Sequence, residues 1–367
     1  MANIFDYLNW RGDLDFKQSE FNDVDNLIIT RFAYFPFDDI IKENEIVTIG
    51  ELSKRFQNLD LSKVQVLQKE DLDLFPALGN SNRFGQLKVT KYINVIDDEK
   101  EKQFSAITVF LPDKTIYIAY RGTDNTLVGW KEDFNLSFKS HLSSQISAKN
   151  YLEEVAKKYS GKLRVGGHSK GGNLAVYAAS FANEKVKKRI INVYNNDGPG
   201  FMDDVTKSKE YLNILNKIHT FIPQSSVIGR LLSHKEKYTI VESTANGIMQ
   251  HDLYSWQILG KNFVILNELS DDSEFVDKTI RDWIIDITPE TREKFVDIIY
   301  DILTKTDAKT LVGLKSNWLR NIKIILKSYS NIDKEDKKMI IEILTLLYNS
   351  ARKNYKNEGK SKKWMIK

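Results

Sequence analysis

The sequence predicts an α/β fold with a mostly parallel central sheet, followed by an all-helical C-terminal region. Between residues 87 and 243, short β-rich runs alternate with helical segments, which is the pattern of parallel strands joined by helices. A serine flanked by glycines, within residues 167–171, stands between one such strand and an Ala-rich helix. After residue 268 the apolar residues recur only at helical spacing. We therefore assign residues 1–267 to an α/β domain and residues 268–367 to a helical C-terminal region with a basic tail.

The predicted elements follow one another along the chain. Helices are expected at residues 26–35, 147–159, 172–184, 211–217, 275–287, 289–302, 309–328 and 333–355. Strands are expected at residues 87–95, 104–111, 115–120, 162–165, 189–194, 218–222 and 238–243. The turn at Asp113-Lys114 joins two antiparallel strands, and the later alternation of strand and helix predicts parallel pairing. The mostly polar segment 124–142 is predicted to be a loop at the carboxyl end of a strand, where open α/β sheets build their sites.

The composition excludes several classes of chemistry. The 367 residues contain no cysteine, so disulfides, thiol nucleophiles and cysteine-bound metals are excluded and a reducing cytoplasm is favoured. The first eleven residues lack the basic start and apolar stretch of a signal peptide, and no run of about 18 apolar residues occurs. We expect a cytoplasmic protein without a membrane-spanning helix.

The positive charge is concentrated at the C-terminal end. Residues 352–367 hold seven Lys or Arg and one Glu, a charge of +6, so the rest of the chain carries −2 of the net +4. The main body is therefore not a basic platform, and we expect no nucleic-acid partner. The tail, with Tyr355 and Trp364 among its lysines, suits peripheral contact with an anionic membrane; the alternative is a solvated, frayed terminus.

Residues 167–171, Gly-His-Ser-Lys-Gly, predict a nucleophile on a sharp strand-to-helix turn. In a G-x-S-x-G turn a strained backbone holds the serine Oγ clear of the sheet, and the small glycines let the chain approach itself closely. The Ala-rich segment 173–182 that follows suits a helix packed tightly on a sheet. Glycine and serine also form ordinary turns, so a plain strand-turn-helix corner is the alternative interpretation of Ser169.

A serine nucleophile needs a base, and the base needs a carboxylate that holds it in one tautomer. In this type of turn the expected order along the chain is Ser, acid, His. His251 alone among the five histidines follows the last predicted sheet strand, in a loop at its carboxyl end, so it is the predicted base. The other histidines precede the serine, adjoin it, or lie in a strand or a basic loop: His141, His168, His219 and His234.

Asp197 is the predicted acid, because it closes the strand after the nucleophile helix and Gly-Pro-Gly at residues 198–200 permits a tight turn. The next strand ends at residues 223–226, Pro-Gln-Ser-Ser, with no carboxylate. Asp252 is a poorer choice, because neighbouring side chains in an extended segment point to opposite sides and Asp252 adjoins His251. The alternative role for the acid is an Asx turn before Gly-Pro.

Backbone N–H groups are the predicted donors to a developing oxyanion. One belongs to Lys170, directly after the serine, and the second to Gly122 or Thr123 at the end of the adjacent strand. The choice between these two residues stays open.

Two parts of the chain resemble known lipases. Residues 121–123, Arg-Gly-Thr, with Trp130 and Asp133 downstream, and the turn at 167–175 are similar to the α/β-hydrolase lipases of the fungal triglyceride type. More closely, residues 6–256 resemble a family of uncharacterised bacterial α/β-hydrolase-like proteins. The resemblance implies an α/β-hydrolase fold and a Ser-Asp-His triad.

The chain departs from the fungal lipases in two places. Lys170 replaces the leucine often found after the lipase serine, and no aspartate follows the later strand where those lipases keep theirs. Residues 196–201, Asn-Asp-Gly-Pro-Gly-Phe, are instead similar to the acid-bearing turn of pancreatic-type lipases.

These features together predict a serine hydrolase that cleaves a carboxylic ester, of a lipid or another acyl substrate, through an acyl-enzyme. Ser169 is the predicted nucleophile, His251 the base and Asp197 the acid, and no metal or organic cofactor is expected. The alternatives are a non-catalytic hydrolase-fold adaptor that binds a protein or membrane surface, and an acyltransferase. Substrate, lid movement and oligomeric state are left open.

Overall fold

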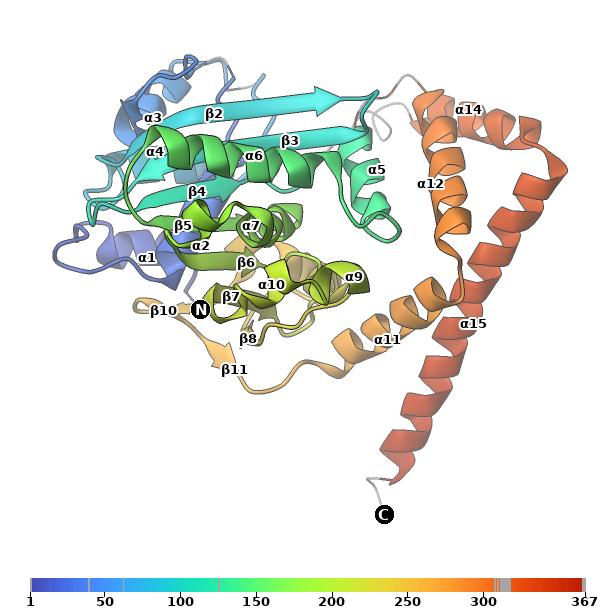
Figure 1. The fold of residues 1–367 in the computed structure, drawn as a ribbon. Coiled ribbons are helices and arrows are strands. Elements are labelled where there is room, and N and C mark those ends of the chain that lie inside the picture. Colours follow the sequence, from blue (N-terminus) through green and yellow to red (C-terminus); the bar gives the residue numbers. More distant parts are fainter. Residues whose placement is uncertain are drawn as a thin grey trace.

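The computed structural model describes residues 2–364 except 39, 62, 125, 307, 309 and 311–317 (Figure 1). Among these residues a nine-stranded sheet forms the centre, in the order β1-β2-β3-β4-β5-β6-β7-β8-β11, and β9 and β10 pair separately. The strands are β1 (Val47–Thr48), β2 (Lys88–Asp97), β3 (Lys102–Phe110), β4 (Ile116–Tyr120), β5 (Leu163–His168), β6 (Ile190–Asn196), β7 (Ile218–Pro223), β8 (Tyr238–Val241), β9 (Ile258–Leu259), β10 (Asn262–Phe263) and β11 (Ile265–Leu266).

Helices cover both faces of the sheet and continue beyond it. They are α1 (Ile4–Arg11), α2 (Asp23–Phe32), α3 (Ile49–Gln57), α4 (Asp71–Asn80), α5 (Leu127–Asn135), α6 (Ser143–Lys158), α7 (Lys170–Phe181), α8 (Glu184–Lys187), α9 (Asp203–Thr206), α10 (Lys209–Leu212), α11 (Asp271–Ile285), α12 (Pro289–Thr304), α14 (Trp318–Asn331) and α15 (Lys334–Trp364). Short 3₁₀ helices are η1 (Leu215–Lys217), η2 (Ile228–Arg230), η3 (Gly247–His251) and η4 (Leu253–Ser255).

The sheet is mixed, which corrects the expectation of a mostly parallel one. Strands β4 to β8 pair in parallel, in four pairings. The four pairings of β1–β2, β2–β3, β3–β4 and β8–β11 are antiparallel. The difference follows from the connections, because a short turn such as residues 111–115 joins only antiparallel neighbours, whereas parallel ones need a crossover. The predicted parallel pairing is therefore right for β4 to β8, and the antiparallel pairing predicted at the Asp113-Lys114 turn is right for β3 and β4. The other three antiparallel pairings were not predicted.

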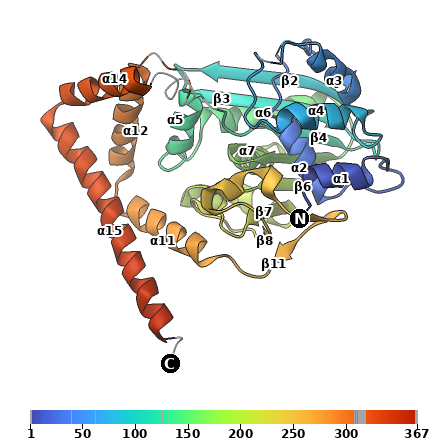
Figure 2. The ribbon, with the colours of Figure 1, turned by 180° about the vertical axis from the view of Figure 1, so that it is seen from behind.

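The two faces of the sheet carry separate cores. In Figure 1, α6 and α7 lie over one face, and they bury small and branched side chains such as Ala148, Leu152 and Ala178 against it. The other face, seen in Figure 2, is covered by α1, α2 and α4. Here α2 is buried along almost its whole length, with Ile28 and Phe32 in the core. On the first face, the close packing of α7 against the sheet fixes the start of α7 relative to β5.

The segment 124–142 is not the loop that its polarity predicts, because α5 occupies Leu127–Asn135. Thr126 caps the helix, with its Oγ1 accepting the Gly129 N–H at 3.1 Å. The polar residues on which the loop prediction rests are buried and paired: Lys131 forms ion pairs, and Glu132 is 1% exposed. Local sequence gives no sign of such distant partners.

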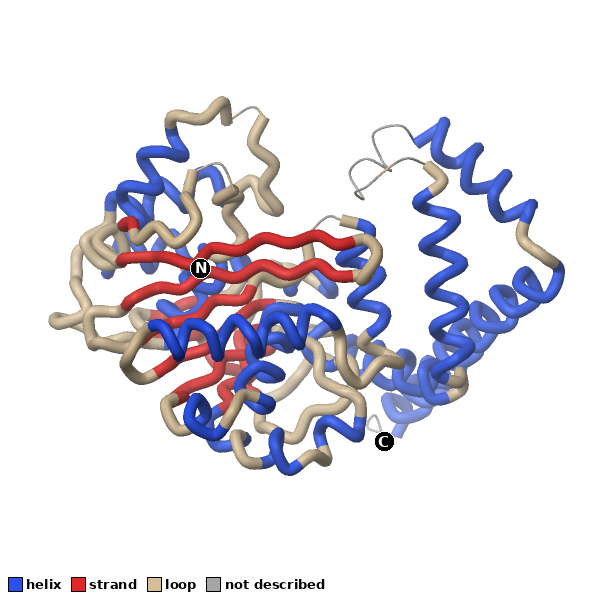
Figure 3. The backbone as a smooth tube through the Cα atoms, turned by 45° about the horizontal axis from the view of Figure 1, so that its top comes forward, coloured by secondary structure: helices blue, strands red, loops and turns tan. Residues whose placement is uncertain are grey.

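The helices after β11 lie beside the sheet at the α5 end, as the tube view shows (Figure 3). The indole Nε1 of Trp283 on α11 donates to the Ile343 carbonyl on α15 at 3.0 Å. Lys131 on α5 pairs with Asp297 on α12 at 2.8 Å. Helix α14 begins at Trp318, so the earlier part of the predicted helix 309–328 lies largely outside the described residues.

Within the described part of the chain, none of the helices combines the length and apolar character that a bilayer crossing requires. Helix α15 extends through Trp364, whereas residues 365–367 and the side chains of 357–364, in the predicted basic tail, lie outside the described part.

Candidate active site

Ser169 stands on a strained turn between β5 and α7. Its backbone has φ 56° and ψ −134°, a combination that residues with a side chain rarely adopt. The neighbouring glycines are required by close contacts: a Cβ on Gly167 would lie 2.2 Å from the Gly171 carbonyl carbon, and a Cβ on Gly171 2.3 Å from the Tyr120 oxygen. This is the geometry of a turn that presents a nucleophile at the carboxyl end of a strand.

Asp197 and His251 form a direct hydrogen bond. The buried Asp197 follows β6, and its Oδ2 accepts the Nδ1–H of His251 at 2.6 Å. The other oxygen, Oδ1, accepts from the Ser226 hydroxyl at 2.5 Å and the Gly229 N–H at 3.2 Å. Because a carboxylate only accepts, Nδ1 carries the proton and Nε2 of His251 is left as an acceptor.

Ser169 and His251 line one open cleft of about 370 Å³. No hydrogen bond joins them, and within the described residues neither the Ser169 hydroxyl nor the His251 Nε2 has a partner. Catalytic hydrogen bonds are often long in the free enzyme and tighten when substrate binds. The His251 imidazole, held by Asp197, and the Ser169 hydroxyl, without a hydrogen-bond partner, therefore belong to residues that line the same cleft.

His168 positions the loop that carries His251. Burial, together with the nearby charges of His251 and Arg31, holds the pKa of His168 well below its ordinary value of 6.5, so the ring is neutral. Its Nε2–H donates to the His251 carbonyl at 2.8 Å, which leaves Nδ1 to accept from the Tyr34 hydroxyl at 3.0 Å. The two imidazole rings lie 4.3 Å apart. Sequence reasoning assigned neither His168 nor Tyr34 a part in the site.

The three candidate oxyanion donors differ in whether their backbone N–H already has a hydrogen-bond acceptor. The Gly122 N–H donates to the Tyr34 hydroxyl at 3.1 Å. The N–H groups of Thr123 and of Lys170, at the first position of α7, have no acceptor among the described residues. The Thr123 hydroxyl donates to Asp133 Oδ1 at 2.7 Å, which holds that residue in place. The geometry thus favours Thr123 over Gly122 as the second donor.

The contacts of the Lys170 side chain explain why a lysine can stand where lipases often have a leucine. Its side chain is buried, with Nζ 2.9 Å from Glu132 Oε2, 3.1 Å from the Gln103 carbonyl and 4.0 Å from Asp133. A buried lysine needs such an acid partner, and that need is the signal by which Glu132 could have been found. Burial raises the pKa of Asp133 from 3.8 to about 6, against the opposing effects of Lys170 and Thr123.

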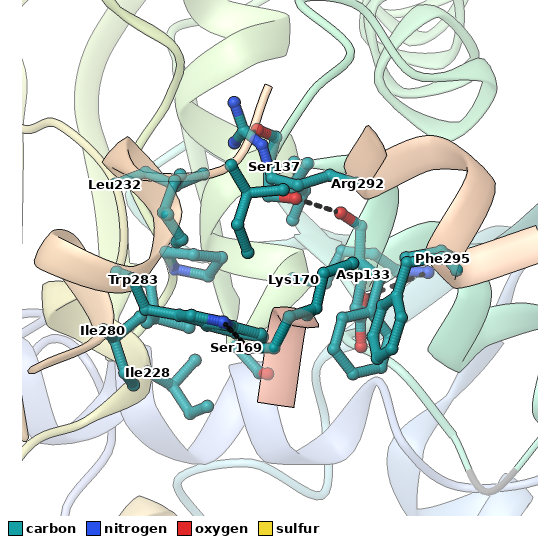
Figure 4. A pocket seen from close by; sticks show the side chains of 18 residues that line it. Asp133, Ser137, Ser169, Lys170, Ile228, Leu232, Ile280, Trp283, Arg292 and Phe295 are labelled. Atoms are coloured by element: carbon teal, nitrogen blue, oxygen red, sulfur yellow. Dashed lines mark hydrogen bonds and ion pairs between the residues drawn. The ribbon is translucent and has the colours of Figure 1, made fainter. Parts of the chain in front are cut away.

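A second cavity, of about 240 Å³ (Figure 4), shares Ser169 with the cleft. Its walls are mostly apolar, and the apolar residues come from the sheet side, such as Leu136 and Ile228, and from α11, such as Trp283 and Ile284. Asp133, Ser169 and Ile228 line both cavities. Where the structure describes the chain, no three His, Asp or Glu side chains gather as a set of metal ligands.

Comparison with known proteins gives one family. A family model described as Mbeg1-like matches residues 78–301, more than half of the chain. Among solved structures, the native Rhizomucor miehei lipase propeptide complex is similar at 15% identity, over 48% of this chain and 70% of that one, with a TM-score of 0.35. A mutant form of MDLA from Penicillium cyclopium is similar at 12% identity, over 66% and 83%, with a TM-score of 0.40. A search of curated proteins finds no match.

Proposed function

The chain belongs to the Mbeg1-like family, and we propose that it is a lipase-like serine hydrolase that cleaves a carboxylic ester. The observation that carries the proposal is the Asp197–His251 hydrogen bond, which leaves Nε2 as an acceptor on a residue that lines the same cleft as the strained Ser169. We assign the fold to the α/β-hydrolase type, with residues 1–267 as the hydrolase domain and 268–367 as a helical region. We also propose a cytoplasmic location, with which the absence of cysteine agrees.

In the proposed reaction Ser169 Oγ attacks the ester carbonyl while His251 Nε2 takes the hydroxyl proton. Asp197 holds the imidazole through Nδ1 and stabilises the imidazolium that forms. His251 then protonates the leaving alcohol, and the acyl group stays on Ser169. Water then hydrolyses the acyl-enzyme. His251 takes a proton from the water while its oxygen attacks the acyl carbon, and the carboxylic acid leaves as His251 returns the proton to Ser169 Oγ.

The N–H groups of Lys170 and Thr123 are the proposed oxyanion hole. Both lack an acceptor in the described structure. Thr123 lines the open cleft and Lys170 lines the apolar cavity, and Ser169 lines both. Gly122 is a poorer donor, because its N–H is already engaged by Tyr34. Each such donor, placed where charge develops, contributes roughly 10²–10³ in turnover. The hydrogen bond from the Thr123 hydroxyl to Asp133 keeps the second donor fixed in advance.

A fluorophosphonate probe tests this function, since labelling requires an activated serine and an oxyanion site together. We expect the probe to modify Ser169, and Ser169→Ala to abolish both labelling and the hydrolysis of p-nitrophenyl acetate. Ser330→Ala, at an exposed serine of α14, is the matched control and should change neither. A folded wild-type protein that resists the probe and leaves the ester intact would favour the adaptor instead.

An acyltransferase uses the same acyl-enzyme and differs only in the acceptor. The open cleft beside Ser169 admits water, which favours hydrolysis. Product analysis separates the two: free acid as the main product supports the hydrolase, whereas an ester of an added alcohol formed faster than free acid would support transfer.

A further inference from the structure

The apolar cavity at Ser169 is built jointly by the sheet and by the C-terminal helices. Its helical wall consists of Ile280, Trp283 and Ile284 from α11 and of Phe295 and Val296 from α12 (Figure 4). Ile343 of α15 closes it, next to the hydrogen bond from Trp283. The family match ends at residue 301, so this wall extends beyond the matched segment through α15.

The helical wall is fastened to the same loops that hold the candidate triad. On α11, the Ser273 hydroxyl donates to the Ser226 carbonyl at 2.7 Å, and Asp277 pairs with Arg230 at 2.7 Å. Ser226 is also the residue whose hydroxyl donates to Asp197. On the opposite side, Arg292 of α12 donates to the carbonyl of Ser137, beyond α5. The wall is therefore placed by direct contacts beside the nucleophile.

We propose that this cavity holds the acyl chain of the substrate, with the alcohol in the open cleft, so that the C-terminal helices set the acyl-chain length. The inference rests on the proposed function. The two cavities meet at Ser169. This suits an ester, because its acyl and alcohol parts lie on opposite sides of the carbonyl that the serine attacks. An apolar chain is driven into the apolar cavity by its removal from water. The open cleft carries Asp124 and Asp252 and suits a polar alcohol.

The size of the cavity indicates a medium-length chain. An apolar cavity of about 150 Å³ holds benzene, with its six carbons, so one of about 240 Å³ has room for roughly ten carbons. A much longer chain would extend beyond this space. The expected substrate is an ester of an acid with about eight to ten carbons.

The first test measures kcat/KM of the full-length enzyme for p-nitrophenyl esters of increasing acyl length. Each methylene that enters the cavity should raise kcat/KM about fourfold, up to roughly eight to ten carbons, after which the value should fall. A profile that is flat from acetate to decanoate, or that rises steadily to palmitate, overturns the proposal.

The second test fills the cavity. Ile284→Trp should lower the ratio of kcat/KM for octanoate to that for acetate by about 100-fold, because three to four methylenes lose their place. Ile285→Trp is the matched control: the neighbouring side chain is 79% exposed, and the ratio should not change. Val296→Phe reaches the cavity from α12 and keeps the test valid if the first variant does not fold. Equal ratios in the Ile284 and Ile285 variants contradict the proposal.

Ligand binding separates this inference from the proposed function. Decanoate should bind the Ser169→Ala variant, measured by calorimetry, and the added Ile284→Trp change should weaken that binding at least about tenfold. Binding without any esterase activity in the wild type would leave the cavity assignment standing and overturn the hydrolase. Ester hydrolysis without decanoate binding would do the reverse.

Discussion

The nucleophile turn and the helical wall of the cavity meet at Ser169 but are held in place by different means. In the turn, backbone approaches backbone so closely that Gly167 and Gly171 leave no room for a methyl group. The wall consists of side chains on α11 and α12, several of them half-buried, docked through a few contacts such as Asp277 with Arg230. The turn should therefore tolerate almost no change, whereas the wall can vary without loss of the chemistry. Catalysis and chain-length preference are then separable by mutation.

The largest effect is expected at the acid. Asp197→Asn should keep the fold and lower kcat on a labile ester by up to roughly 10⁴-fold, because an amide favours the wrong imidazole tautomer. The loss should be the same for acetate and octanoate, since the cavity wall is untouched. Stopped-time assays on both esters, with circular dichroism as the check on folding, measure it.

Three other aspartates serve as controls for that prediction. Asp252 accepts the Tyr254 N–H, and Asp203 pairs with the exposed Lys207. Asp204 accepts the N–H of Val205. Their Asn variants should retain most of the turnover. If one of them loses turnover while Asp197→Asn does not, the acid has been assigned to the wrong carboxylate.

The nucleophile turn and the helical wall should also differ in how much a substitution lowers the free energy of unfolding. Gly171→Ala places a Cβ 2.3 Å from the Tyr120 carbonyl oxygen, so backbone must shift, and a loss of about 3 kcal/mol or more in unfolding free energy is expected. Ile284→Ala, in the half-buried wall, should lose only about 1 kcal/mol. Urea unfolding of both variants measures the difference. Equal losses would mean that the wall is as constrained as the turn.

The same contrast explains what could be predicted from sequence. The turn is specified locally, by glycines two residues either side of Ser169, and so the strand before it and the helix after it were predicted with bounds within three residues of the observed ones. The antiparallel pairing of β3 with β4 was also predicted, from the turn at Asp113-Lys114. The edge pairings of β1 and β11 were not, because these strands have two residues each and pair with segments far along the chain. Such short edge strands leave no periodic pattern to detect.

Polar residues with distant partners misled the sequence analysis in a similar way. The polarity of segment 124–142 predicted a loop, but its residues Lys131 and Glu132 pair with the distant Glu101 and Lys170, and the segment contains a helix. The cavity wall was missed for the same reason: helical spacing identified α11 and α12 but not the surface that they face. Asp197 and His251 were selected because each follows the end of a predicted strand, and in the structure a hydrogen bond joins them. Their catalytic roles remain predictions.

A smaller effect is expected from the charge of Asp133, whose pKa burial raises from 3.8 to about 6. Between these two values the folded state binds the proton more tightly than the unfolded state, so this group makes stability fall as pH rises through the window. Asp133→Asn removes that penalty. The variant should gain about 1–3 °C in Tm over the wild type at pH 7.5 and nothing at pH 4. Differential scanning calorimetry at both pH values measures it, and a gain at pH 4 alone would have the wrong sign.

The last prediction concerns membrane binding rather than turnover or stability, because we propose that α15 contacts an anionic membrane surface. Ile341, Leu344 and Tyr348 are more than half exposed at helical spacing, and the exposed Arg352 and Lys356 continue the same helix. Each basic residue near an anionic surface contributes about 1 kcal/mol, so reversing both charges should weaken binding to phosphatidylserine vesicles by at least roughly 30-fold at low salt. Salt should diminish the difference, because it screens exposed charges.

Co-sedimentation of the full chain measures this binding, and Lys185→Glu on α8 combined with Lys188→Glu at the end of that helix is the control. Both residues are exposed, and the control changes the net charge by the same amount at a site on the hydrolase side. If the two double variants bind equally, the total charge governs adsorption and α15 has no special part. If only the α15 variant loses binding while its acetate turnover matches the wild type, the membrane surface and the catalytic turn are separate. In that case the helices that shape the acyl cavity also present it to a lipid surface.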